Sequence, residues 1–485
     1  MDTTGTVSAY VDSSSCVAAR LHEKQATRTN LVAVRRGLGQ PEVLSGTENS
    51  IELAGLWCNT GQLGCGDTRA RTAPQLLRDL GSISLTSLAC GSGHSVAIDA
   101  AGGAHAWGDG ASGQLGTGDR ADRVTPELVR LDGQRVTRAA CGARHTLLAT
   151  ARGRVLSCGH NGRGQLGLGE LPRGALSCDR PRLLDELLGT RVVDLWAGFE
   201  HSFFLSGAGL LLSCGAGDLG QLGQGGLADA HAPAAVVGLA VLVHTAASGN
   251  YHGLALTEDG VMSWGEGLYG RLGHGTSGRE SVPRRVVGLE GLVVTSVACG
   301  GACSAAVTAD GELYTWGSST WRQCGHEEGT EQLEPRRLEA LSAVQVRQAD
   351  GGEDHMAVLT SIGTVLTWGR ACHGRLGHSA PSQSSAAACA SSARAASTLS
   401  YPPSGQLPWH PLYGPNATKH AAEGAAGAAG AAGAAGAAGA AGAAGAAGAA
   451  GAAGAAGAAG AACTRPVVVP GVADASQVFC GEAPN

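Results

Sequence analysis

Five histidines in this chain close the same short word, in which two variable residues separate a glycine from a histidine. They are His94, His145, His201, His252 and His355. Histidine carries protons near neutral pH and ligates metals, so a regular set of five could do either kind of chemistry. A metal site needs its nitrogens about 2 Å from one ion, and these residues recur at intervals that place each in a separate structural unit. We therefore favour a structural role, in which each histidine hydrogen-bonds backbone in its own turn, and keep a metal ring as the alternative.

Motifs for catalysis do not emerge elsewhere in the sequence. The pair of histidines with a glutamate that marks zinc proteases does not occur, and Gly91-Ser92-Gly93 matches only part of a nucleophile elbow. Gly110–Gly113 is not followed by Gly-Lys-Ser or Gly-Lys-Thr, so it is not a phosphate loop. We expect no enzyme, no catalytic residue, no cofactor and no metal, with a hydrolase or lyase as the third-ranked alternative.

The histidine word belongs to a longer internal repeat. A second word, usually Gly-Gln-Leu-Gly, occurs seven times, with its final glycines at residues 64, 116, 167, 223, 273, 325 and 377. A third word places tryptophan before glycine at Trp107, Trp264, Trp316 and Trp368, and cysteine fills this slot at Cys158 and Cys214. Three words in phase, at steps of 50 to 56 residues, indicate a repeated structural unit.

The segments between these words predict strands. They are short and alternate apolar with polar residues, as at Val96 and Ile98. A period of this length accommodates four strands and their turns, which is the content of one propeller blade. The sequence therefore predicts an all-β fold, a seven-bladed β-propeller. The tryptophan or cysteine before glycine is expected to face the neighbouring blade.

Taken together, the three words resemble the regulator of chromosome condensation repeat over about residues 50–378, and the resemblance resumes near Thr464. It implies a seven-bladed propeller. In the founding member of that family, the histidine position and the residue before it face a small GTPase and promote nucleotide release. Carried over by motif, the candidate partner-binding residues are His94, His145, Glu200, His201, His252, Asp354 and His355.

This chain departs from the family pattern at several of these positions. Only Glu200 and Asp354 supply an acidic residue before histidine, while Cys303 and Pro484 replace histidines. We therefore expect a protein-interaction scaffold or regulatory binding module. The alternative is a guanine-nucleotide exchange factor for a Ran-like or other small GTPase. A light-sensing branch of the family uses tryptophans in the same loops, and their absence here sets photoreception aside.

The cysteines follow the repeat, which argues for a structural role. Cys90, Cys141, Cys299 and Cys480 all precede the glycine of the histidine word. Equivalent positions in a ring are poorly placed for bridging, so we expect small buried core residues rather than disulfides or metal ligands.

The chain divides by composition into four segments. Residues 1–45 form a polar leader with a candidate closing strand at Leu31–Val34, and residues 46–378 hold repeats one to six and the start of the seventh. Residues 379–463 form an insertion, and residues 464–485 complete the seventh repeat. Within the insertion, 424–462 is thirteen Gly-Ala-Ala units, which cannot bury a core face. We expect a disordered low-complexity insertion in the last blade.

The seventh repeat stops before its closing strands. We expect N-terminal residues, Ile51–Trp57 together with Leu31–Val34, to complete that blade, because a closed ring leaves no exposed strand edge. A truncated gene model is the alternative.

Charge and hydropathy bear on partners and location. The formal net charge is −6 and Lys24 and Lys419 are the only lysines, which does not favour direct nucleic-acid binding. The longest apolar stretch, 234–243, is half the length of about twenty that a membrane helix needs. Met1–Tyr10 lacks the layout of a secretory signal. We expect a monomer in the cytoplasm, or in the nucleus, with a protein partner and no membrane contact.

Overall fold

The computed structural model describes residues 29–36, 51–55, 60–80, 83–169, 171, 175–239, 241–371, 374–377, 462–469 and 475–481. These residues lie in one compact unit formed by residues 1–386 and 460–485. The Gly-Ala-Ala tract falls outside the described residues up to Gly460 and Ala461, so the prediction of disorder there is not tested. Its last residue, Ala462, already begins a strand.

The described strands form four-stranded antiparallel sheets, and six of these sheets are blades built from four consecutive strands. The first three blades contain β4 (Leu85–Cys90), β5 (His94–Asp99), β6 (Ala104–Gly108) and β7 (Arg123–Leu128); β8 (Val136–Cys141), β9 (His145–Thr150), β10 (Val155–His160) and β11 (Ser177–Leu183); and β12 (Val192–Ala197), β13 (His201–Ser206), β14 (Leu211–Gly215) and β15 (Ala230–Ala235). The next three contain β16 (Val243–Ser248), β17 (His252–Thr257), β18 (Gly260–Gly265) and β19 (Glu280–Arg285); β20 (Val294–Cys299), β21 (Cys303–Thr308), β22 (Leu313–Gly317) and β23 (Gln332–Arg337); and β24 (Val346–Gly351), β25 (His355–Thr360), β26 (Val365–Arg370) and β27 (Ala462–Val468).

One further sheet joins the two ends of the chain, and we call it the composite sheet. Its order is β28-β1-β2-β3, with β28 at Ala475–Gly481, β1 at Thr29–Arg36, β2 at Ile51–Gly55 and β3 at Arg71–Leu76. In the register, Val34 of β1 lies opposite both Val478 of β28 and Glu52 of β2. The expected pairing of the leader strands with the end of the chain is confirmed.

The blades are offset from the repeats read in the sequence, and this corrects two expectations. The sequence predicted seven equivalent blades, whereas the structure has six blades of consecutive strands and the composite sheet. The insertion does not interrupt the sheet that the leader completes. It lies between β26 and β27, the third and fourth strands of the last consecutive blade, where Leu366 pairs with Val468 across it.

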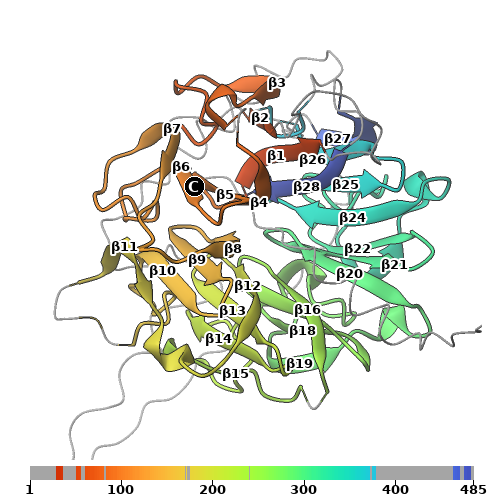
Figure 1. The fold of residues 1–485 in the computed structure, drawn as a ribbon. Helices are drawn as coiled ribbons and strands as arrows, with labels where there is room; N and C mark the ends of the chain where they lie inside the picture. Colours follow the sequence, from red (N-terminus) through yellow and green to blue (C-terminus); the bar gives the residue numbers. More distant parts are fainter. Residues whose placement is uncertain are drawn as a thin grey trace, which may run out of the picture. The chain divides into compact units, whose positions relative to one another are not determined.

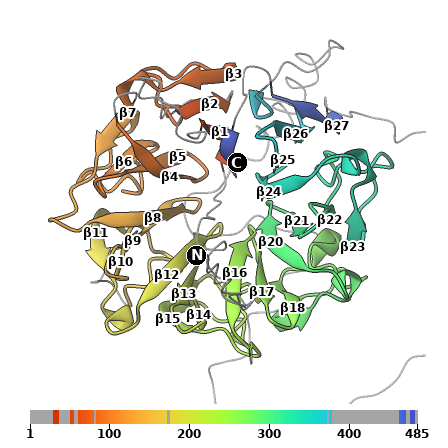
Figure 2. The same ribbon diagram turned by 45° about the vertical axis from the view of Figure 1, so that its right-hand side comes forward.

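The sheets follow one another around a ring (Figures 1 and 2). The first strands of successive blades contact each other from β4 through β8, β12, β16, β20 and β24, and β28 contacts both β24 and β4. Short 3-10 turns link most blades: η2 (Arg78–Leu80), η3 (Asp185–Leu187), η5 (Val287–Leu289) and η6 (Glu339–Leu341). A further one, η4 (Leu268–Gly270), lies between β18 and β19.

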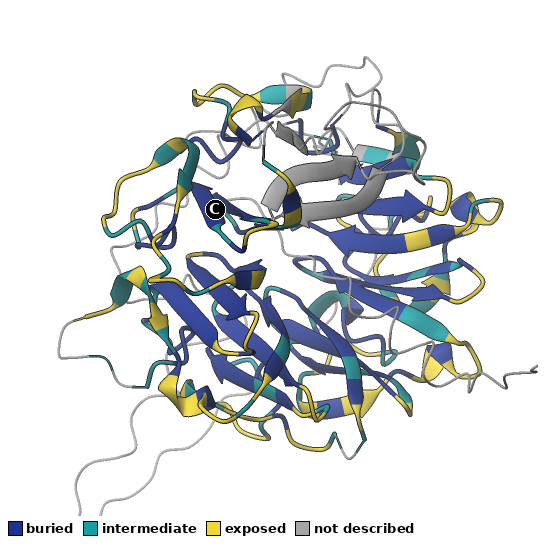
Figure 3. Ribbon diagram, viewed as in Figure 1, coloured by how far each residue is buried: buried dark blue, intermediate teal, exposed yellow. Residues whose placement is uncertain are grey.

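The core lies between the blades, and the third word supplies its largest side chains. Trp107, Trp264, Trp316 and Trp368 are fully buried, and the first three strands of each blade are mostly buried (Figure 3). The cysteines at the repeat positions are buried free thiols, namely Cys90, Cys141, Cys158, Cys214 and Cys299. Their predicted role as small core residues is confirmed, while the side chain of Cys480 lies outside the described residues.

Candidate protein-interaction site

The five histidines lie inside the ring of blades. Each begins the second strand of its blade and has 0% of its surface exposed. His94, His145, His201 and His252 also pack against the glycine of their own word. A Cβ built on Gly249 would lie 1.8 Å from Nδ1 of His252, and one on Gly198 would lie 2.1 Å from Cε1 of His201. The word therefore needs glycine because the imidazole fills the space where a side chain would stand.

Three of the histidines hydrogen-bond to a hydroxyl of the next blade. The Nε2 atoms of His94, His145 and His252 lie 2.8, 3.0 and 2.9 Å from the hydroxyls of Thr146, Ser202 and Ser304. Those hydroxyls donate to the backbone carbonyls of Gln114, Gln165 and Arg271, each at 2.7 Å. A hydroxyl has one hydrogen to donate, so the imidazole Nε2–H must be the donor to it.

Burial keeps these imidazoles neutral. Loss of solvation lowers the pKa of His94, His145 and His355 from 6.5 to about 3. This burial agrees with the structural role that we favoured for the histidines. The predicted hydrogen-bond partner was wrong for three of them, because Nε2 bonds to a hydroxyl of the neighbouring blade and not to backbone in the same turn. Buried in this way, the five imidazoles do not form a surface that a partner could contact.

Backbone carbonyls at equivalent positions of the repeat bind the third word, and that of Arg271 accepts from both Ser304 and Trp316. The indole N–H groups of Trp107, Trp264, Trp316 and Trp368 donate to the carbonyls of Gln62, Gln221, Arg271 and Gln323 at 2.9 to 3.0 Å. Each carbonyl belongs to the second residue of a Gly-Gln-Leu-Gly word in the preceding sheet. The three sequence words are thus one hydrogen-bonded joint between neighbouring blades.

The acidic candidate Glu200 is partly exposed, whereas the histidines are buried. It precedes β13, and 31% of its side chain is accessible. Loss of solvation raises the pKa of its carboxyl, and the nearby guanidiniums of Arg163 and Arg144 only partly oppose this. Its closest cation is Arg163, whose Nη1 lies 4.0 Å away. Glu200 is a partly desolvated carboxylate with a weak partner.

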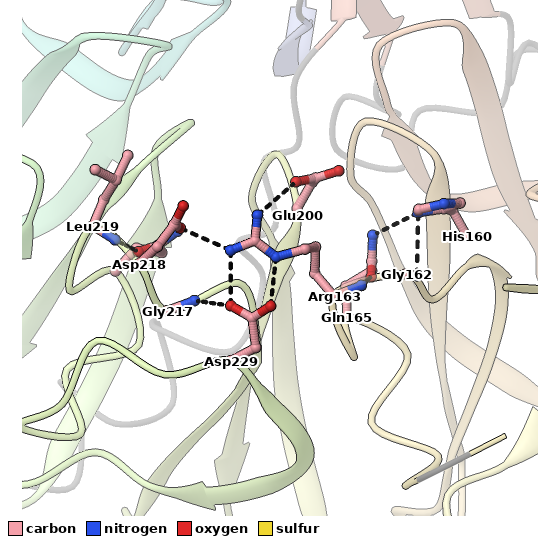
Figure 4. Close-up of polar contacts among 10 residues, drawn as sticks. His160, Gly162, Arg163, Gln165, Glu200, Gly217, Asp218, Leu219 and Asp229 are labelled. Carbon is pink, nitrogen blue, oxygen red and sulfur yellow. Dashed lines mark hydrogen bonds and ion pairs between the residues drawn. The ribbon is translucent and has the colours of Figure 1, made fainter. Parts of the chain in front are cut away.

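Arg163 gathers two more carboxylates from the next blade. Its Nε lies 2.5 Å from Oδ2 of Asp229 and its Nη2 lies 3.0 Å from Oδ1 of Asp218. Figure 4 shows the guanidinium between these two residues and Glu200. Burial would raise the pKa of Asp229, but the hydrogen bonds from Arg163 and the amide of Gly217 lower it overall. The ion pairs raise the pKa of Arg163. One cation therefore faces three carboxylates at this point.

The other acidic candidate, Asp354, is held in a second network. Its Oδ2 lies 3.0 Å from Nη1 of Arg370 and 3.7 Å from Nη1 of the buried Arg375. Arg370 in turn stacks over the ring of Trp321 at 4.3 Å. Asp354 lies three blades from Glu200 around the ring, so the structure does not bring the two acidic candidates into contact.

Both networks lie at one end of the propeller, which we call the Glu200 end. Loops between the first and second strands and between the third and fourth strands form it, because antiparallel strands return alternate connections to the same side. Aromatic rings accompany the charges there, and Phe199 and Tyr251 lie 5.9 Å apart between ring centroids. The sequence reading did not single out Arg163, Asp218, Asp229 or Trp321. For Arg163, Asp218 and Trp321 the signal was variability just before the Gly-Gln-Leu-Gly word. Asp229 lies six residues after that word and carried no such signal.

Comparison with known proteins now identifies the repeat. The family model for the RCC1-like domain matches residues 124–347, and models of the Regulator of chromosome condensation (RCC1) repeat match residues 57–98 and 85–114. The chain belongs to this family. The buried histidines and tryptophans are therefore residues of RCC1 repeats, and they lie where neighbouring blades meet.

Curated RCC1-type relatives are longer than the region that matches. The chain is 32% identical to the "Ultraviolet-B receptor UVR8" of Arabidopsis thaliana over 319 residues, which is 65% of this chain and 60% of that protein. It is 33% identical over 324 residues to the "E3 ubiquitin-protein ligase HERC2" of Homo sapiens, of which it spans 7%.

Solved structures share the fold. Human WBSCR16 superposes with a TM-score of 0.61 at 26% identity, covering 68% of this chain and 90% of that one. Prp20p from Saccharomyces cerevisiae superposes with a TM-score of 0.60 at 22% identity, covering 71% and 84%. Within the described part of the chain, no helix is long and apolar enough to cross a membrane.

Proposed function

We propose that this protein is an interaction module whose binding surface is the Glu200 end of the propeller. The observation that carries the proposal is the unequal charge around Arg163, where one guanidinium faces the carboxylates of Glu200, Asp218 and Asp229. Glu200 is the least satisfied of the three, because it is partly desolvated and 4.0 Å from its cation. A cationic side chain of a partner protein would complete its interactions.

Charge complementarity of this kind favours selection of a partner and rapid association. The aromatic pair of Phe199 and Tyr251 lies on the same end, and aromatic residues are enriched in protein interfaces. The surface therefore suits a protein that presents basic residues beside an apolar contact. We also propose that this partner is met in the cytoplasm, or in the nucleus.

Affinity capture with quantitative mass spectrometry tests the proposal. The full chain should enrich a discrete set of proteins, and Glu200→Lys with Asp218→Lys should reduce their recovery at least fivefold. Glu290→Lys with Glu339→Lys is the matched control, since both residues are exposed and lie in links between blades at the opposite end of the propeller. Equal recovery with both double variants would reject the Glu200 end as the binding surface.

Exchange on a small GTPase is the second candidate function. It is supported by the acid-before-histidine arrangement at Glu200 and Asp354 and by the family. The solved structure of Prp20p is described together with "Its Binding Properties to Gsp1p and Histones". Such a protein would bind the nucleotide-free GTPase better than the loaded one, and so shift the population.

Release of labelled GDP from a panel of small GTPases separates the two functions. Faster GDP release that is lost in Asp354→Ala would support exchange. If no GTPase of the panel releases GDP faster, the interaction-module function is favoured. Asp354→Ala is preferred to a change at His355, because that imidazole is fully buried and its removal would perturb the fold.

We further propose that the composite sheet serves as the seventh blade of the propeller. Its inner strand β28 contacts the inner strands β24 and β4 on either side, and its four strands are ordered as in the other blades. A closed ring would hold the loops of the Glu200 end in a fixed arrangement.

A further inference from the structure

The opposite end of the propeller carries a band of equivalent positions, which we call the Arg152 end. Turns between second and third strands and links between blades form it. At three successive joints, the residue before the inner strand packs over the turn glycine of the preceding blade. A Cβ on Gly102 would meet Arg135, one on Gly153 would meet Arg191, and one on Gly209 would meet Leu242, each within 2.8 Å. These links and turns form a band along this end.

Four arginines cluster in one sector of the band. Arg135 and Arg191 occupy the link position, and Arg152 and Arg154 flank Gly153 in the turn between them. Backbone bonds hold the group together, with the amide of Ala151 donating to the carbonyl of Arg135 at 2.8 Å and that of Val192 to Gly153 at 2.9 Å. All four side chains belong to exposed residues.

These arginines form no ion pair with any residue that the structure describes, unlike Arg163 at the Glu200 end. Arg135 is oriented by backbone instead, since its Nε donates to the carbonyl of Ala101 at 2.9 Å. Four like charges in one sector repel one another, and a bound anion would relieve that repulsion. Guanidinium groups bind carboxylates through paired hydrogen bonds.

The next sector of the band is apolar. Leu242 occupies the same link position as Arg191, and Leu210 occupies the same turn position as Arg154. Leu242 packs over Gly209 beside Leu210, and the two leucines are 50% and 46% exposed. Further round, the turns carry the exposed Asp259 and Asp310. The band therefore changes from basic to apolar to acidic along three neighbouring sectors.

We propose that the Arg152 end is a second docking surface, which binds an acidic protein segment carrying a bulky apolar residue beside its carboxylates. The carboxylates pair with Arg135, Arg152, Arg154 and Arg191, and the apolar side chain covers Leu210 and Leu242. A nucleic acid or an anionic membrane fits less well, because their continuous negative charge would extend from the arginines over the leucines toward Asp259 and Asp310. This surface is separate from the Glu200 end, so it stands whether or not the function proposed above holds.

Fluorescence anisotropy with the full chain tests the proposal. The probe is a labelled twelve-residue peptide with aspartates and glutamates in one half and leucines next to them. We expect saturable binding that weakens at least tenfold when the acids become amides, and also when the leucines become serines. Labelled twelve-nucleotide single-stranded DNA and vesicles with phosphatidylserine should bind more weakly than the peptide.

Two double variants locate the site. Arg152→Glu with Arg191→Glu should weaken peptide binding at least tenfold, and Leu210→Ser with Leu242→Ser should weaken it severalfold. The control Arg180→Glu with Arg347→Glu changes the net charge equally at exposed residues that lie outside the band, and should leave affinity within twofold. Thermal melting confirms that each variant is folded.

Three results would overturn the proposal. They are peptide binding by the wild-type chain weaker than about 1 mM, equal losses in the band and control variants, and tighter binding of DNA or vesicles than of peptide. A protein that passes this test and fails the affinity-capture test at Glu200 would retain the Arg152 end as its only supported docking surface.

Discussion

The joints between blades differ in how the buried histidine position is paired, and the difference shows what the repeat requires. Three joints are polar, and in each a buried histidine donates to a hydroxyl of the next blade, as His94 does to Thr146. Between blades β20–β23 and β24–β27 two sulfur atoms replace the imidazole and the hydroxyl, with Sγ of Cys303 3.7 Å from Sδ of Met356. Cys303 replaces the histidine and Met356 replaces the hydroxyl residue, so neither an imidazole nor a hydroxyl is buried at this joint without the other.

This paired replacement has an energetic reason. A buried donor or acceptor that loses its partner costs about 1–3 kcal/mol, whereas replacing both partners by apolar groups is nearly neutral. At the joint after β13 a third solution occurs, where Gly253 holds the place of the hydroxyl. There the ring of His201 lies edge-on to Phe203 with centroids 5.0 Å apart, and Phe203 approaches Trp264.

Removal of the leader strands should have the largest effect, because it disrupts the joints on both sides of the composite sheet. Deleting residues 1–56 removes β1 and β2 and leaves β28 without its neighbour in that sheet. We expect the melting temperature to fall sharply in differential scanning calorimetry. Deleting residues 1–28 removes no described strand and serves as the control. An unchanged melting curve for the longer deletion would contradict the role assigned to the composite sheet.

Loss of a joint tryptophan should come next. Trp316→Ala empties a fully buried site and removes the N–H that donates to the carbonyl of Arg271. We expect a loss of about 3–5 kcal/mol in the free energy of unfolding, measured by urea denaturation. Trp321→Ala, at a partly exposed ring on the Glu200 end, should cost much less. Equal losses would show that the tryptophan slot does not carry the joint.

The polar and sulfur joints can be compared directly by conservative changes. Thr146→Val keeps the shape of the side chain but leaves Nε2 of His94 without its acceptor, so we expect a loss of about 1–3 kcal/mol. Met356→Leu at the sulfur joint preserves volume and should cost less than about 1.5 kcal/mol. Urea denaturation measures the free energy of unfolding of both variants. A larger loss in Met356→Leu than in Thr146→Val would contradict this expectation.

Acid should weaken the polar joints and spare the sulfur joint. The pKa of His94 and His145 is about 3 in the folded chain and about 6.5 when unfolded. The unfolded state therefore binds more protons below pH 6.5, and the stability present above that pH is lost as the pH falls toward 3. We expect each such histidine to contribute a slope of up to about 1.4 kcal/mol per pH unit.

Urea denaturation at pH 7.5, 6.0 and 5.0 measures this slope. His94→Gln should reduce it by the share of one histidine, since glutamine does not titrate in this range. The Cys303 and Met356 pair contains no group that gains charge between these pH values, so Met356→Leu should leave the slope as it is. A slope that does not respond to His94→Gln would contradict the burial of a neutral imidazole.

Much of the fold could be predicted because it depends on local and periodic signals. The alternation of apolar residues predicts strands such as β5, and the words at fixed intervals predict blades. The joining of residues 31–34 and 51–55 to the sheet of the last repeat was also expected, because a closed ring leaves no strand edge exposed. The place of the insertion within a blade was misread, because repeats in sequence do not reveal which strand begins a sheet.

The candidate site was predicted less well, and the reason is distance along the chain. The word that contains His94 says nothing of Thr146, which lies 52 residues away, and Arg163 reaches Asp229 across 66 residues. The histidines carried over as candidate partner-binding residues are buried, while Glu200, one residue before such a histidine, is partly exposed.

The sequence by itself determined that this chain repeats, that its repeats are four-stranded blades, and that glycine, histidine and tryptophan recur where the blades meet. These features follow from spacing and from the limits that side-chain size sets on close packing. Only the tertiary structure decided which groups are paired. It places Arg163 among three carboxylates at one end and leaves Arg135, Arg152, Arg154 and Arg191 without carboxylate partners, among the described residues, at the other. Charge balance depends on distances between loops of different blades, and closure of the ring sets those distances.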